Sequence, residues 1–310
     1  MLTVLQTALE VGLIYGLVAL ALFISFSILN IADLSTDGCF TLGCAVGAML
    51  TIAGHPLLAL PAAMAAGMLS GYVTAFLQTR LGVESILAGI ISNTGLYTIN
   101  LAVMGFSSNV SITGVDTVFS LFKGLVGGQW SRLILLALIA AVLVLVLIRF
   151  FGTSLGLSIR ATGDSLDMVS ASSINPKATI TIGLCLANAL TALSGCLIGE
   201  YNKFCDINLG TGMVTIALAS LIIGEVFAGR RGSVGKRVVC VVLGSIVYRF
   251  IIALALRLNI SAEYFKLVSA VIVAVAIAAP NMKDYVHLAK IKSNARKLRA
   301  LSGKGDETDA

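Results

Sequence analysis

The chain has 310 residues, of which 58% are hydrophobic and 12% charged, with a formal net charge of +6 and a mean hydropathy of +1.00. A soluble domain has about 25% charged residues, so one water-soluble core could not bury this much apolar surface. The composition therefore excludes an ordinary soluble enzyme and indicates an integral membrane protein.

Apolar runs of about 20 residues, the length needed to cross a bilayer, recur along the chain. They lack the alternation of membrane β-barrel strands, and a helix satisfies its own backbone hydrogen bonds in lipid. We expect an all-α polytopic membrane protein with about nine segments, although eight to ten fit the pattern. The nine are 8–29, 38–54, 57–79, 86–106, 131–150, 178–200, 211–228, 238–256 and 264–281. The second, seventh and eighth are short or interrupted by glycine, which predicts some broken or re-entrant helices.

Lys and Arg residues in the loops predict the orientation, because cytoplasmic loops carry an excess of positive charge. With nine spans, fifteen of these residues lie on the side of the C-terminal tail and five on the other side. The sequence thus predicts a cytoplasmic C-terminus and an external N-terminus. Residues 1–285 form the predicted transmembrane domain, and residues 286–310 form a basic, then acidic tail that we expect to be partly disordered.

A polar segment, residues 152–177, separates the fifth and sixth spans. It contains helix-forming pieces, Gly163, and the pair Asn175-Pro176, which ends one helix and starts the next. The expected structure is a short helix along the membrane surface, then a turn, then a span. On the predicted cytoplasmic side, such a helix can present polar groups to a soluble partner.

Residues 160–168, followed by 174–176, resemble the coupling loop of ABC importer permeases, in the variant of the branched-chain amino acid and ribose-type family. Residues 29–48, 82–105 and 188–225 resemble further landmarks of that family, so that the resemblance covers about residues 8–285. The chain looks most like a subgroup often paired with binding proteins for tryptophan, tyrosine or related compounds. It departs from the general pattern of ABC permeases, because Arg-Ala-Thr stands where many of them have Glu-Ala-Ala.

The resemblance implies a permease subunit of a binding-protein-dependent importer in a bacterial inner or plasma membrane. Two permease copies, a homodimer rather than a heterodimer, would form the pathway. Separate ATPase subunits would bind ATP and Mg, and an extracellular or periplasmic protein would deliver the solute. The expected solute is an aromatic or branched-chain amino acid, with a nucleoside or a sugar as the alternative.

Nothing in the sequence predicts a catalytic, metal, cofactor or nucleic-acid site in this chain. It has two His and no Cys-x-x-C pair, and its Gly-rich segment 232–237 lacks the first glycine and the Ser or Thr of a phosphate-binding loop. A stand-alone secondary transporter or channel is the alternative function. Such proteins need coupling groups near the middle of the membrane, and this chain has few charges deep in its predicted spans.

By the same resemblance, residues of the polar loop would couple the permease to the ATPase. Arg160 would pair with carboxylates of the ATPase, Gly163 would allow close approach, and the following turn would be set by the Asn-Pro pair. The alternative is a solvated loop that only connects two helices. The candidate coupling residues are Arg160, Ala161, Thr162, Gly163, Asp164, Asn175 and Pro176.

Polar side chains within spans are costly in lipid and often face a transport pathway. Asn93 and Asn100 in the fourth span and Asn188 in the sixth are the candidates, and hydrogen bonding between helices is the alternative role. Asp37, at the start of the second span, is expected to cap the N-terminus of its own helix.

Glu200, Tyr201 and Asp206 are expected at the outer mouth, where they would meet the binding protein, screen substrate charge or form a solvated rim. Arg249 lies within the eighth span and needs a partner or a route to water, with Glu225 or Glu200 as candidate partners.

Overall fold

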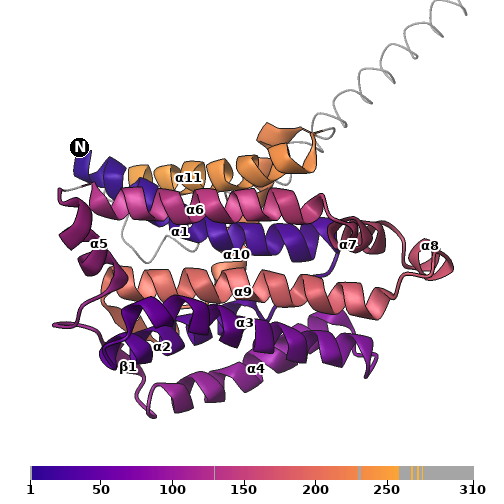
Figure 1. Cartoon of the computed structure of the whole chain (residues 1–310), viewed down its shortest axis with the longest axis horizontal. Coiled ribbons are helices and arrows are strands. Elements are labelled where there is room, and N and C mark those ends of the chain that lie inside the picture. The colour runs from indigo at the N-terminus through magenta and orange to yellow at the C-terminus, as the bar shows by residue number, and fades with distance from the viewer. Residues whose placement is uncertain are drawn as a thin grey trace, which may run out of the picture.

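The computed structural model describes residues 2–128, 130–229 and 232–257, together with residues 267, 271 and 274. This part of the chain is a bundle of helices with one small hairpin of two strands (Figure 1). In chain order the elements are α1 (Leu2–Leu22), the π-helix η1 (Phe23–Ile28), α2 (Thr36–Ile52), α3 (Pro56–Thr79), α4 (Ser85–Val103), β1 (Asn109–Ser111), α5 (Val118–Val126), α6 (Ser131–Phe151), α7 (Ser154–Asp164), α8 (Leu166–Ala171), α9 (Pro176–Asn202), β2 (Phe204–Asp206), α10 (Met213–Ala228) and α11 (Val234–Arg257).

Within the described residues, six helical segments are long and apolar enough to cross a membrane: α1 with η1, α3, α4, α6, α9 and α11. Each coincides with a predicted span, which confirms the all-α polytopic fold. The predicted ninth segment, 264–281, lies outside the described residues apart from 267, 271 and 274, and the predicted tail, 286–310, lies wholly outside them.

The two shorter apolar helices are α2 and α10, with 17 and 16 residues. At 1.5 Å per residue each is about 25 Å long, less than the roughly 30 Å of a hydrocarbon core. The prediction of short helices at the second and seventh segments is therefore confirmed. The eighth segment is not broken, because α11 is a continuous helix of 24 residues.

Helix α9 forms the centre of the bundle, and all its residues from Ala187 to Glu200 are buried. Helix α2 runs parallel to the second half of α9. At one end, the Cys39 thiol donates to the Asn188 carbonyl at 3.3 Å, and at the other the Thr51 hydroxyl donates to the Glu200 carboxylate at 3.1 Å. Helix α2 therefore begins beside the middle of α9, not at its end.

Glycines bring the backbones of α2 and α9 into contact. A Cβ atom on Gly43 would lie 1.9 Å from the carbonyl oxygen of Ala192, and one on Gly195 would lie 1.9 Å from that of Phe40. Small residues allow this approach between membrane helices, where van der Waals packing and interhelical hydrogen bonds hold the helices together.

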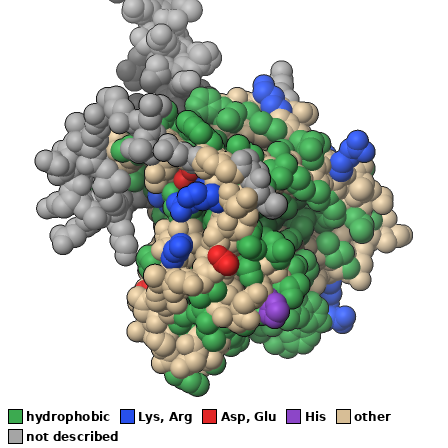
Figure 2. Space-filling model, turned by 60° about the vertical axis from the view of Figure 1, so that its left-hand side comes forward, with side chains coloured by type: hydrophobic (Ala, Val, Ile, Leu, Met, Phe, Trp, Pro, Cys, Tyr) green, Lys and Arg blue, Asp and Glu red, His purple; other side chains and the backbone are tan. Residues whose placement is uncertain are grey.

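The outer surface of the bundle is largely apolar. Hydrophobic side chains make up much of the face seen in Figure 2, with few charged ones among them. On α3 and α6, Leu69, Leu138 and Leu145 are all more than half exposed, as expected of helices that face lipid. Helices α7 and α8 lie at one end of the bundle, and α5 and β1 lie at the other (Figure 1).

The contact between α2 and α9 leads to a stability prediction. Gly43→Ala should lower the free energy of unfolding by about 1–3 kcal/mol, because the new methyl group forces two backbones apart. In the control Gly95→Ala, the new Cβ meets no atom within 4 Å, so better helix propensity should stabilise the protein by up to about 1 kcal/mol. Denaturant unfolding in mild detergent measures the change in the free energy of unfolding for both variants. Equal effects of the two changes would contradict the tight contact.

Candidate functional site

The polar loop between α6 and α9 forms two short helices, α7 and α8, where the sequence predicted one, and then the predicted turn into the span α9. The side chain of Thr153 caps α7 and that of Ser165 caps α8. Asn175 accepts hydrogen bonds from the backbone N–H groups of Lys177 and Ala178, at 3.0 and 3.4 Å, and thereby caps α9, with Pro176 as its first residue. The two loop residues expected to set the turn therefore do so.

The candidate coupling residues do not all face the same way. Asp164 is exposed, and Arg160 and Ala161 are partly exposed. Thr162 is buried, with its hydroxyl 2.8 Å from that of Thr179 in α9. A Cβ atom on Gly163 would lie 1.8 Å from the Ile28 carbonyl oxygen, so this glycine allows close approach to η1 of the same chain rather than to another protein.

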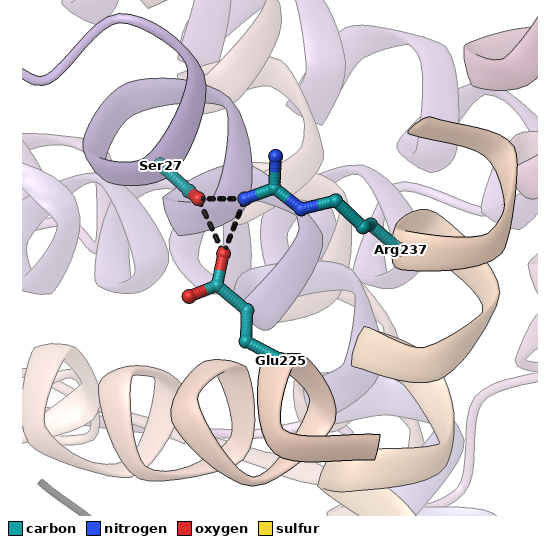
Figure 3. A network of polar contacts seen from close by, with 3 residues as sticks. All are labelled: Ser27, Glu225 and Arg237. Carbon is teal, nitrogen blue, oxygen red and sulfur yellow. Dashed lines mark hydrogen bonds and ion pairs between the residues drawn. The ribbon is translucent and has the colours of Figure 1, made fainter. Parts of the chain in front are cut away.

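Next to the contact between Gly163 and Ile28, three polar side chains join η1, α10 and α11 (Figure 3). One Nη2 atom of Arg237 donates to the Glu225 carboxylate and to the Ser27 hydroxyl, each at 2.6 Å, and Ser27 also donates to Glu225. The guanidinium group lies 5.1 Å from the centre of the Phe23 ring, a cation–π contact. We call Ser27, Glu225 and Arg237 the three-residue network.

Arg249, in α11, contacts an aromatic ring rather than a carboxylate. Glu225 pairs with Arg237, so it is not the partner of Arg249, and neither is Glu200. The Arg249 guanidinium instead lies 3.7 Å from the centre of the Tyr15 ring. The ion pair with Glu225 or Glu200 that the sequence left open does not form, and an aromatic ring of α1 contacts the guanidinium group instead.

The N-terminus of α10 is held by a side chain from another helix. The Asp37 carboxylate accepts hydrogen bonds from the backbone N–H groups of Gly212 and Val214, each at 2.9 Å. The prediction that Asp37 caps its own helix was therefore wrong: it caps α10, where a negative charge suits the helix dipole. Helix α10 is thus hydrogen-bonded near both ends, to Asp37 at one and to the three-residue network at the other.

A cavity of about 320 Å³ lies beside Asp37. Its walls are the first turns of α2, one side of α4 and the segment before α10. Among its lining residues are Asp37, Thr41, Asn93, Thr94, Tyr97 and Asn100. The structure therefore brings the two asparagines of the fourth predicted span to one polar cavity.

Asn100 is 1% exposed, and its amide nitrogen donates to the carbonyl oxygen of Gly38 at 3.0 Å. Its Oδ1 atom has no hydrogen-bond partner within the described part of the chain. A buried polar atom without a partner is uncommon in proteins and calls for an explanation.

Asn188, the third asparagine, does not line this cavity. It is 1% exposed, and its amide nitrogen donates to the Asp33 carboxylate at 2.9 Å. Asp33 in turn accepts hydrogen bonds from the Ser35 N–H and hydroxyl, at 2.9 and 2.6 Å. These bonds fix the start of α2 against α9, which is the helix-to-helix role that the sequence left as the alternative. The side chains of Asp33 and Ser35 were not among the predicted site residues.

The three residues predicted at the outer mouth have different environments. Glu200 is 1% exposed and accepts from the Val118 N–H at 2.8 Å, so the expectation of a solvated rim residue was wrong for it. Tyr201 is partly buried and donates to Glu10 at 2.9 Å. Asp206, in β2, is partly exposed. Glu200 is buried because it caps the first turn of α5, which the sequence did not predict as a helix.

The chain matches the family described as "Branched-chain amino acid transport system / permease component" over residues 4–277. It is 31% identical over 294 residues to a protein of Clostridioides difficile (strain R20291) named "Tyrosine transport system permease protein", and this match covers 94% of the chain and 95% of that protein. It is also 31% identical over 284 residues to an uncharacterised protein of Rickettsia prowazekii (strain Madrid E), with 91% and 99% covered.

No solved structure matches the chain significantly. The family match extends over six long apolar helices and the two short ones between them. The chain is therefore a multi-pass membrane protein that belongs to the family of permease components of branched-chain amino acid transport systems.

Proposed function

We propose that the chain forms the transport pathway of a binding-protein-dependent importer of amino acids, with aromatic amino acids as the first candidates. The relative named for tyrosine transport, similar along nearly the whole chain, supports this solute class. ATP and Mg are bound by separate ATPase chains, a second permease copy completes the pathway, and an external binding protein delivers the solute. The N-terminus lies outside and the C-terminus in the cytoplasm of a bacterial cell.

The attachment of α7 carries the proposal of ATPase coupling. Thr162 and Gly163 fasten this helix to α9 and η1, while Arg160 and Asp164 stay accessible. A helix held in this way can transmit a movement to η1. The contact between Gly163 and Ile28 is between backbones, so rotation of a side chain cannot absorb the movement. The exposed charges give the ATPase a surface to bind.

Helix α10 connects this contact to the cavity. Movement of α7 acts on η1, whose Ser27 is bonded to Glu225 of α10. The opposite end of α10 is bonded to Asp37 in the cavity wall. A shift of α10 along or about its axis would therefore alter the cavity, which is how a distant ATP-driven movement would change access to the solute.

The alternative of a stand-alone secondary transporter has one supporting observation. Short helices that begin inside the bundle, such as α2 and α10, also occur in ion-coupled transporters. In that case the isolated chain would transport solute without an ATPase.

The first test is ATPase binding. We expect the double variant Arg160→Glu/Asp164→Lys, co-expressed with its ATPase and purified through a tag on the permease, to lose most of the ATPase that the native chain retains. The matched control, Asp116→Lys/Lys123→Glu, makes the same two charge reversals at exposed positions in the segment from β1 to α5 and should retain the ATPase. Retention by both folded variants would place the docking surface elsewhere. Flux by the native chain alone would favour the secondary transporter.

The second test concerns the three-residue network. Glu225→Gln should leave the ATPase bound but lower uptake per ATP hydrolysed by about tenfold, because a hydrogen bond to a charged group contributes about 1.5–3 kcal/mol. ATP hydrolysis and uptake are measured together in proteoliposomes. The charge exchange Glu225→Arg/Arg237→Glu should restore part of the coupling. Full coupling in Glu225→Gln would show that the network is only structural.

A further inference from the structure

The cavity beside Asp37 offers negative charge and no positive charge. Among the described residues that line it, Asp37 is the one charged side chain, and none is Lys, Arg or His. The other polar groups are hydroxyls and amides, which do not distinguish the sign of a ligand's charge. Asp37 therefore makes the cavity prefer a ligand group with a positive charge.

A helix N-terminus commonly binds anions, but the one nearest the cavity is already in use. The N–H groups of Gly212 and Val214, at the start of α10, both donate to Asp37. A carboxylate that entered the cavity would meet the Asp37 carboxylate and not these donors. The cavity thus disfavours the acid end of an amino acid.

Two residues that line the cavity, Asp37 and Asn100, have free acceptor positions. The two oxygens of Asp37 have four lone pairs between them, and backbone N–H groups at the start of α10, those of Gly212 and Val214 among them, do not use all four. Asn100 is bonded to Gly38, the next residue after Asp37, and its buried Oδ1 atom lacks a partner. Together they provide at least three acceptors, and an ammonium group has three N–H donors.

Two further features suit a small organic cation. Tyr97 lines the cavity, and aromatic side chains can attract cations. The volume of about 320 Å³ lies at the lower end of the range for small-molecule sites, about 300–1,000 Å³.

We propose that this cavity is the subsite for the ammonium group of the transported amino acid, with Asp37 and the Oδ1 atom of Asn100 as its acceptors. The proposal rests on the proposed function, because it assumes that the cavity belongs to the amino acid pathway. It goes further by naming the ammonium group as the part of the solute that the permease itself recognises, independently of the binding protein.

The test measures protection of a thiol in the cavity wall. In the permease–ATPase complex without binding protein, Thr94→Cys is labelled with a maleimide in the presence of millimolar L-tyrosine, tyramine or 3-(4-hydroxyphenyl)propionate. Tyramine keeps the ammonium group of tyrosine and lacks the carboxylate, whereas the propionate keeps the carboxylate and lacks the ammonium group. Thr98→Cys, which is exposed on the same helix and does not line the cavity, is the control for general effects on reactivity.

We expect L-tyrosine and tyramine to slow the labelling of Thr94→Cys, the propionate to leave it unchanged, and no probe to affect Thr98→Cys. Adding Asp37→Asn should raise the tyramine concentration needed for protection by about tenfold, the effect of losing one hydrogen bond to a charged group. Asp116→Asn, an exposed carboxylate outside the cavity, should not change it. If Asp37→Asn fails to fold, the comparison of the three probes still decides the question.

Protection by the propionate, or by no probe at all, would overturn the ammonium subsite. Either result would leave the proposed function standing if the same complex still couples ATP hydrolysis to uptake when the binding protein is added. Failure of the native chain to bind the ATPase would instead contradict the proposed function, whatever the thiol protection shows.

Discussion

The fold depends on two carboxylates that let helices begin inside the bundle. A helix start leaves backbone N–H groups without partners, and lipid offers none, so such a start needs acceptors from the protein itself. Asp33 supplies them at the segment leading into α2, and Asp37 supplies them at the start of α10. Asn188 holds Asp33 against α9.

The helices around this point are held by two different kinds of contact. Helix α2 is fixed to α9 by backbone contact at Gly43 and Gly195, which leaves no room for sliding. Helix α10 is in close backbone contact with α11 at Gly224 and Gly244, and near its ends it is bonded to other helices through the side chains of Asp37 and Glu225. Hydrogen bonds from side chains can exchange partners during a movement, whereas interlocked backbones cannot. The structure therefore combines two closely packed helix pairs, α2 with α9 and α10 with α11, and side-chain hydrogen bonds at the ends of α10 that can change.

Hydropathy predicted the helical fold and the described spans, because crossing lipid imposes a length and an apolar composition on each helix. The same pattern marked α2 and α10 as short. It could not give the partners of Asp37 or Glu200, because these lie 175 and 82 residues away along the chain and depend on tertiary packing. Gly163 was singled out as a point of close approach, yet its partner is η1. A sequence shows where a glycine allows close packing, but not which neighbouring segment packs against it.

Under the proposal that the cavity beside Asp37 binds the solute, the arrangement of α10 suggests how the same cavity would also release it. An ATPase can shift an equilibrium between two permease states only by binding one of them more tightly, and the difference must reach the cavity through contacts that differ between the states. The bonds of Asp37 are suited to this, because the same residue caps α10 and lines the cavity. When α10 moves, the cap and the acceptors offered to an ammonium group change together. Solute affinity and the position of α10 are then linked by a single side chain, and the link acts in both directions.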